Sequence, residues 1–330
     1  MKDTMTASLL YCADPLRAGR AARVDPVFAE EAAQAGAYGV TRALLDHDAL
    51  LAGDTNRALA RVERGSGPYW YRGWMMPATV YATLERALAE RGCALLTGAA
   101  DFRRGHELPG WYGEFAALTP ASRWLPRPPG APPTQDELAT LAAPLGPGPG
   151  IVKDYVKSRK HEWDEACFVP ELTDTARLSA VVERFFALQE DTLTGGVVLR
   201  AYEPFVPGGE ARVWWVDGAP ALTTAHPDTP DRFPAPETAA VAEAVRALGA
   251  RFVTTDLALR EDGEWRVVEV GDGQVSGLPP GPDATPLFAA LAKAGGAAPG
   301  PTGEVAAPGP ATGASALRPG ARSAGLQSGE

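Results

Sequence analysis

The stretch FVTTDLALREDGEWRVVEVGDGQVSG, residues 252–277, constrains the fold of this chain more than any other. Two apolar runs flank the turn EDGE at 261–264, and an Asp-Gly pair between such runs is the strongest local signal for a β-hairpin. The first predicted strand carries Asp256, and the second carries Glu269 with Asp272 just beyond it. Carboxylates that face each other across paired strands repel unless a cation lies between them.

Two interpretations of these carboxylates stay open on the residues alone. Solvated turn acids account for the carboxylates at 261–264, but valines surround Glu269, and a lone carboxylate there is costly to bury. A Mg²⁺ ion that carries nucleotide phosphates is the usual partner of such a pair.

Length, charge and cysteine content exclude several classes of protein. A chain of 330 residues predicts two or three domains, and a net charge of −10 argues against nucleic acid as a partner. Apolar runs are too short for a membrane span or a signal peptide. Three cysteines without a CxxC pair indicate neither a disulfide framework nor a zinc site. We therefore expect a cytoplasmic protein with no membrane partner.

The pattern of apolar runs and Pro/Gly punctuation divides the chain into five segments. Residues 1–125 alternate short strands with helices, which predicts a parallel α/β layer. A Pro/Gly-rich linker at 126–150 contains a short helix, with Thr134 as its predicted N-cap. Both strands, with alternating apolar residues, and helices, with the helical apolar repeat, are predicted in 151–206 and in 207–295. The tail 296–330 is Ala/Gly/Pro/Ser-rich and is expected to be disordered.

Charged residues inside apolar strands are the candidates for binding. Lys153 lies in the run IVKDYV, where it either meets an anion or reaches solvent from an edge strand. In GGEARVWWV, Glu210 and Arg212 share one face of a predicted strand. They are either a surface ion pair of little energy or a pair that grips ribose hydroxyls and phosphate oxygens.

Arginines of the N-terminal layer are weaker candidates. Arg17, Arg20 and Arg23 follow the first predicted strand, and Arg72 lies in the aromatic run YWYRGW. Each is a candidate for binding an acidic substrate group at the carboxyl edge of the sheet, and a structural role is the alternative.

The order Lys153, Glu203, Glu210 with Arg212, Asp256 and Glu269 resembles the ATP-grasp ligase superfamily over residues 120–290. The segments IVKDYVKS, VLRAYEPF, GEARVWWVDG and VVEVGDGQVSGLP are similar to the R2K branch, which is itself similar to the ribosomal-protein glutamate ligases. The resemblance implies an ATP-grasp fold, in which an N-terminal parallel α/β layer precedes two α+β lobes, 151–206 and 207–295, that enclose a nucleotide.

The resemblance also implies a role for individual residues. Lys153 and Lys157 would contact phosphate, and Glu210 would hold the ribose. The backbone that binds the adenine edge would come from Tyr202, Glu203 and Phe205. Arg212 would stabilise the transferred phosphoryl group. Asp256 and Glu269 would bind Mg²⁺, with Mn²⁺ as an alternative, and Asp272 or Gln274 would replace the family's asparagine ligand, since Gly271 stands at its position.

The activity that the resemblance implies is an ATP-dependent ligase. Such an enzyme activates a carboxylate as an acyl phosphate, couples it to an amine or another nucleophile, and releases ADP and phosphate. Its partners would be small-molecule or peptide carboxylates and amines, and a homodimer is a candidate for the oligomeric state, which stays open. A degenerate nucleotide-binding or sensor protein without turnover is the alternative, because the asparagine is absent and the loop SRKHEWDEA contains no glycine.

Overall fold

The structure is a computed structural model that describes residues 7–17, 22–226, 229, 235–279 and 281–296. Arg20 and the predicted disordered tail from residue 297 onward lie outside these residues. Among the described residues, no helix is both long and apolar enough to span a bilayer.

The first part of the chain forms the predicted parallel α/β layer. Its sheet has the order β2-β1-β3, and β1 pairs in parallel with both neighbours. The predicted strand at 94–96 forms only a single bridge between Leu95 and Tyr69, and the predicted helix at 54–64 ends at Ala58. The elements are β1 (Ser8–Cys12), α1 (Ala29–Ala37), β2 (Arg42–Leu45), α2 (His47–Leu51), α3 (Thr55–Ala58), β3 (Tyr69–Arg72), α4 (Ala78–Ala89), α5 (Ala99–His106) and α6 (Leu108–Phe115).

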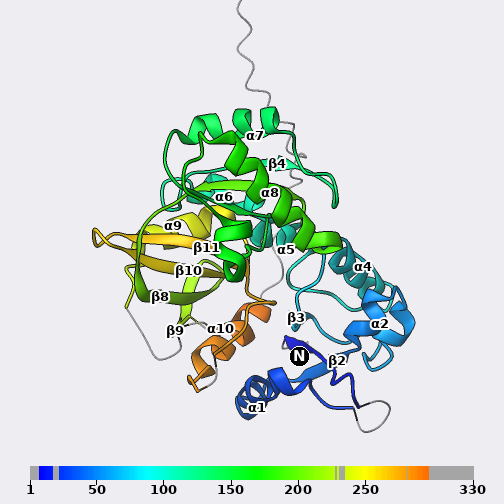
Figure 1. Cartoon of the computed structure of the whole chain (residues 1–330). Helices are drawn as coiled ribbons and strands as arrows, with labels where there is room; N and C mark the ends of the chain where they lie inside the picture. Colours follow the sequence, from blue (N-terminus) through cyan, green and yellow to red (C-terminus); the bar gives the residue numbers. More distant parts are fainter. Residues whose placement is uncertain (1–6, 18–21, 227–228, 230–234, 280, 297–330) are drawn as a thin grey trace, which may run out of the picture. The chain divides into compact units, whose positions relative to one another are not determined.

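A second, antiparallel sheet follows, with the order β4-β7-β5-β6. Its strands and helices are β4 (Ser122–Pro126), α7 (Gln135–Ala142), β5 (Gly150–Lys153), β6 (Phe168–Val169), α8 (Thr175–Gln189) and β7 (Gly196–Ala201). Helices α7 and α8 pack against each other beside this sheet (Figure 1). The N-cap prediction for Thr134 is confirmed, because its side chain and that of Glu137 form a reciprocal capping box.

The third sheet contains the predicted hairpin and has the order β11-β10-β8-β9. Its elements are β8 (Phe205–Val216), β9 (Ala219–Ala225), α9 (Ala239–Leu248), β10 (Phe252–Arg260), β11 (Trp265–Asp272) and α10 (Thr285–Gly295). Strands β10 and β11 lie side by side in the yellow part of the chain (Figure 1), and Asp256 pairs directly with Glu269, as predicted.

The two faces of this third sheet have different neighbours. Side chains of one face, including Val213, Trp215 and Val253, share a core with α6 and α9. On the other face, Trp214 and Phe252 belong to the same core as the strands of the N-terminal layer. Because side chains alternate along a strand, Arg212 and Asp256 lie on the second face, next to the part that the N-terminal layer covers.

Candidate active site

The centre of the site is an ion pair between neighbouring strands. Arg212 on β8 pairs directly with Asp256 on β10, and its guanidinium donates two hydrogen bonds, of 2.7 and 2.8 Å, to the two carboxylate oxygens. Burial alone would raise the pKa of Asp256, but Arg212 and His226 outweigh burial and hold that pKa well below its usual range. Asp256 is therefore an anion at neutral pH.

A histidine that sequence reasoning missed completes this cluster. The Nε2 atom of His226 lies 3.4 Å from Asp256 and 3.7 Å from Glu210. Burial opposes the charged imidazole, but the contacts with Asp256 and Glu210 outweigh it and raise the pKa of His226. Burial also raises the pKa of Glu210, and Asp256 adds to this effect. His226 joins the cluster through the register of β8 with β9, which puts residue 226 beside residue 210 and which the sequence did not indicate.

Two buried cations lie on the second sheet and face Glu269. Lys153 on β5 and Arg200 on β7 are diagonal neighbours on one face, since Lys153 pairs with Val198. Burial, with a smaller effect of Arg200, lowers the pKa of Lys153 to about 8, and burial lowers that of Arg200 to about 10. Glu269 lies close enough to raise both pKa values. Two buried like charges favour a bound anion between them.

Arg200 itself carries a further sign of a missing partner. Its Nε donates to Ser122 Oγ over 3.1 Å, and its Nη1 donates to the carbonyl of Val268 over 2.6 Å. Its Nη2 is buried and has no hydrogen-bond partner within the described part of the chain. Sequence reasoning did not assign Arg200 to the site, although an arginine in the apolar strand VVLRA was a visible signal.

The segment expected to bind the adenine edge connects the two sheets. The backbone N–H of Tyr202 donates to Pro149 O, and the Tyr202 ring meets Trp163 and Phe168 edge-on. The carboxylate of Glu203 is already held by Arg266 over 2.9 Å. In this segment the side chain of Glu203 is therefore structural, and the backbone groups and the exposed Tyr202 ring remain for a base.

Two further predicted residues lie at the edges of the site. Phe205 begins β8 and pairs with Arg260. Lys157 is exposed in the loop after β5, and its backbone N–H donates to the Asp154 carboxylate.

Asp272 lies on the opposite face from the cluster, so we revise its assignment to the metal set. It pairs with Val253, three residues before Asp256, and an odd offset reverses the face. Gln274 donates to it over 3.1 Å, and burial raises the pKa of Asp272 to about 7. Gln274 cannot act in its place, because its side chain accepts from Tyr71 N.

Position 271, which the family fills with asparagine, is close to two hydroxyl side chains that would have to shift to admit a Cβ. A Cβ on Gly271 would lie 3.0 Å from Thr254 Oγ1 and 3.2 Å from Ser276 Oγ. These two hydroxyls are hydrogen-bonded to each other over 2.7 Å.

Of the two roles considered for Arg72 from the sequence, the structure supports the structural one. Its side chain is not free to bind a substrate carboxylate. Its side chain is fully buried and pairs with Glu31 through two hydrogen bonds of 2.7 and 2.5 Å. It also donates to the carbonyls of Gly273 and Ser276, in the loop that follows β11.

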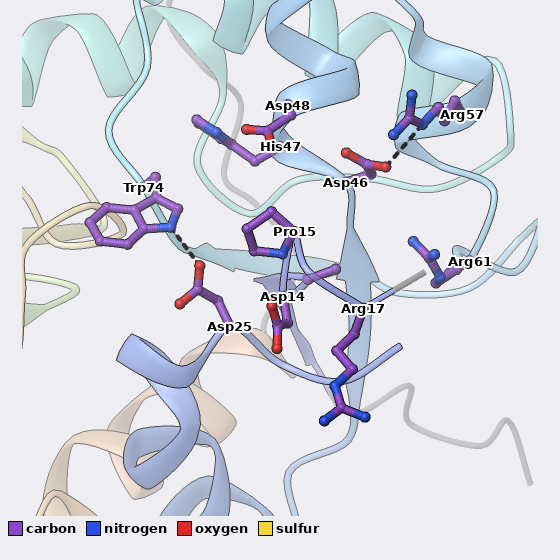
Figure 2. A pocket seen from close by; sticks show the side chains of 11 residues that line it. Asp14, Pro15, Arg17, Asp25, Asp46, His47, Asp48, Arg57, Arg61 and Trp74 are labelled. Carbon is purple, nitrogen blue, oxygen red and sulfur yellow. Dashed lines mark hydrogen bonds and ion pairs between the residues drawn. The ribbon is translucent and has the colours of Figure 1, made fainter. Parts of the chain in front are cut away.

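A separate pocket lies at the carboxyl ends of β1 and β2 (Figure 2). Figure 2 shows Trp74 donating to Asp25 and Arg57 donating to Asp46, and both carboxylates also accept from turn amides. Arg17 lines this pocket. The acids are therefore largely satisfied by the protein, and none of the lining residues belongs to the cluster around Asp256.

The donor sets fit a divalent cation and a polyphosphate. Glu210, Asp256 and Glu269 offer carboxylate oxygens on neighbouring strands, which are the ligands that Mg²⁺ prefers. Across from them, Lys153 and the unpartnered Nη2 of Arg200 offer N–H donors of the kind that bind phosphate.

A parallel α/β layer followed by two sheets that enclose such a site defines an ATP-grasp protein. Residues 144–293 match the family described as the ATP-grasp domain, R2K clade family 3. The resemblance found in the sequence is therefore confirmed. Proteins of this class are ATP-dependent ligases that use ATP and Mg²⁺.

Three solved structures share the fold. The RimK domain ATP-grasp protein from Sphaerobacter thermophilus DSM 20745 is 15% identical with a TM-score of 0.57, over 87% of this chain and 99% of that one. The D-cycloserine synthetase DcsG is 17% identical with a TM-score of 0.57 and the same coverages. The ATP-grasp ligase PsnB, complexed with the precursor peptide PsnA2 and AMPPNP, is 14% identical with a TM-score of 0.51, over 89% and 99%. A comparison with curated proteins found no match.

Proposed function

We propose that this chain is an ATP-dependent carboxylate–amine ligase, which forms an acyl phosphate and couples it to an amine or a related nucleophile. The observation that carries the proposal is the buried pair Lys153 and Arg200, which lies close to Glu269, the cross-strand partner of Asp256. Phosphates between these two sets of charges would satisfy the cations directly and the carboxylates through a divalent ion.

The chemistry needs positioned charges more than covalent groups. In the first step a substrate carboxylate oxygen attacks the γ-phosphorus, and the bond to the β-phosphate oxygen breaks so that ADP leaves with the electron pair. In the second step the amine attacks the acyl carbon, phosphate leaves with the electron pair, and the nitrogen loses a proton. Lys153, Arg200 and Arg212 would hold the phosphoryl oxygens through both steps.

The metal would be held by Asp256 and Glu269, and when bound it supplies neutralisation of phosphate charge. Glu210 is proposed to reach either the ribose or the metal, because its carboxylate lies beside His226 at the edge of the cluster. Tyr202 and the backbone to Phe205 would lie against the base. We propose Lys157, which is exposed, as a side chain that closes over the phosphates.

The acid and the nucleophile are proposed only by class. PsnB is complexed with a precursor peptide and DcsG is a synthetase of a small molecule, so both a peptide and a small-molecule carboxylate are candidates here. A homodimer stays a prediction.

Calorimetry with ATP and Mg²⁺ tests the proposal. We expect magnesium-dependent binding by the wild type and a loss of about tenfold or more in Glu269→Gln, because a ligand carboxylate is removed. Glu261→Gln is the matched control, since Glu261 is an exposed acid in the turn of the same hairpin. A wild type that binds no ATP would contradict the proposal, and so would equal binding by both variants.

A screen for ADP release then separates a ligase from a nucleotide sensor. Candidate acids and amines are added in pairs to the wild type with Mg²⁺ and ATP. Release that needs both members of a pair supports ligation. ATP binding without release for any pair would favour the sensor alternative.

A further inference from the structure

The atoms that converge on Asp256 include a nitrogen donor. We propose that His226 is a direct ligand of the divalent ion together with Glu210 and Asp256, and that it gives the site a preference for Mn²⁺ over Mg²⁺. The inference rests on the proposed function, because it concerns the ion that would accompany the nucleotide.

The geometry of the three side chains supports a common ion. One ligand atom from each of Glu210, His226 and Asp256 lies within 4.8 Å of the other two. Neighbouring ligands of an octahedral ion lie about 3 Å apart when each bond is about 2.1 Å. The separations of 3.4 and 3.7 Å between His226 Nε2 and the two carboxylates need only side-chain adjustment to reach that value.

Neighbouring strands of one sheet hold the three side chains close together. Glu210 lies on β8 and Asp256 on the adjacent β10, and His226 directly follows β9, the other neighbour of β8. Both His226 and Asp256 are buried, so little side-chain freedom is left to lose when an ion binds.

Arg212 does not prevent Asp256 from binding an ion. It takes one hydrogen bond on each carboxylate oxygen, and each oxygen of a carboxylate has two lone-pair positions. By its bidentate contact Arg212 fixes the orientation of the carboxylate, as outer partners of metal ligands commonly do.

A simple ion pair is the competing explanation for His226. In that case an imidazolium would pair with both carboxylates across 3.4 and 3.7 Å, and the ¹⁴N experiment below distinguishes this ion pair from a metal ligand. An imidazole nitrogen in the ligand set favours first-row transition ions, whereas Mg²⁺ prefers oxygen ligands only. Mn²⁺ accepts both kinds of donor, which leads to the stated preference.

Pulsed electron paramagnetic resonance of the full-length chain tests the ligand directly. The probes are Mn²⁺ alone and Mn²⁺ with AMPPNP. We expect the ¹⁴N modulation of a coordinated imidazole in the wild type and its disappearance in His226→Gln. His161→Gln is the control, because His161 is exposed in the loop after β5, and it should keep the modulation. Glu210→Gln should bind Mn²⁺ more weakly but retain the nitrogen signal.

Calorimetry supplies the second readout. His226→Gln should weaken Mn²⁺·AMPPNP binding about 10- to 100-fold and Mg²⁺·AMPPNP binding far less. Equal weakening with both metals and no ¹⁴N modulation would overturn the inference and assign His226 to phosphate instead. AMPPNP binding by the wild type without ¹⁴N modulation would overturn only this inference. If the wild type binds AMPPNP with neither Mn²⁺ nor Mg²⁺, the proposed function is contradicted. The experiment with Mn²⁺ alone would still show whether His226 is a metal ligand.

Discussion

At the scale of single residues, burial gives Lys153 an unusual acid–base behaviour. The side chain is 6% exposed and lies beside Arg200, so its ammonium has lost water and gained a like charge. With the pKa lowered from 10.5 to about 8, Lys153 of the folded protein loses its proton at a lower pH than it would in the unfolded chain. The buried ammonium therefore lowers the free energy of unfolding by its full amount below pH 8. This loss of stability disappears as pH rises from about 8 to 10.5.

This pKa predicts how nucleotide affinity depends on pH. A phosphate bound at Lys153 needs the ammonium, so Mg²⁺·ATP affinity should fall about tenfold between pH 7 and pH 9. In Lys153→Arg the guanidinium stays charged, and affinity should vary much less over the same range. Calorimetry at both pH values measures this. The same pH dependence in both proteins would show that another group titrates.

At the scale of elements, the loop after β11 is held from the N-terminal layer. Arg72 at the end of β3 donates to two carbonyls of the loop, and its guanidinium lies 5.1 Å from the ring centre of Trp214. On the other side, Arg212 donates to Gly277 O over 3.2 Å. The loop therefore connects a buried arginine of the first layer to the arginine of the candidate site.

The buried pair of Arg72 with Glu31 predicts a large cost for losing one partner. Arg72→Met should lower the free energy of unfolding by about 3–5 kcal/mol, because the Glu31 carboxylate stays buried without its cation. Adding Glu31→Gln should recover much of that loss. Urea denaturation measures both variants.

Arg251→Met is the matched control. Arg251 also lies over a tryptophan ring, 5.0 Å from the centre of Trp70, but its partner Asp217 is largely exposed. The control should cost about 1 kcal/mol. Equal costs for Arg72→Met and Arg251→Met would show that burial of the ion pair is not the deciding factor.

At the scale of the whole molecule, the first layer and the third sheet share one hydrophobic core. Trp214 and Phe252 of the third sheet pack among residues of β1, β3 and α4. We predict that these parts unfold together, because neither can expose its half of the core alone at low cost. Hydrogen exchange in urea measures this. Earlier exchange of β1–β3 than of β8–β11 would contradict it.

Features that depend on local pattern were predictable from the sequence. The hairpin with Asp256 opposite Glu269 followed from alternation and an Asp-Gly turn, and the N-cap at Thr134 followed from the helix start. β8 begins at Phe205 and so extends toward the N-terminus beyond the predicted strand GGEARVWWV. Helices α5 and α6 were not predicted, since Gly105, Pro109 and Gly110 interrupt their apolar pattern.

Features that depend on tertiary register were not predictable. His226 joins the cluster only because β9 pairs with β8 in one particular register, and Asp272 leaves it because of an odd offset from Glu269. Arg72 is buried by a partner 41 residues away in the chain. The local pattern of a single sequence does not indicate which distant residues pair.

The shared core has a consequence for how proteins of this architecture can be recombined. A chimera that took residues 1–121 from a relative would also receive that relative's counterparts of Glu31 and Arg72, and these must match the carbonyls at 273 and 276 and the ring at 214. Grafting at this junction would exchange the arginine that holds the loop after β11 along with the layer. The N-terminal segment is thus not an interchangeable module.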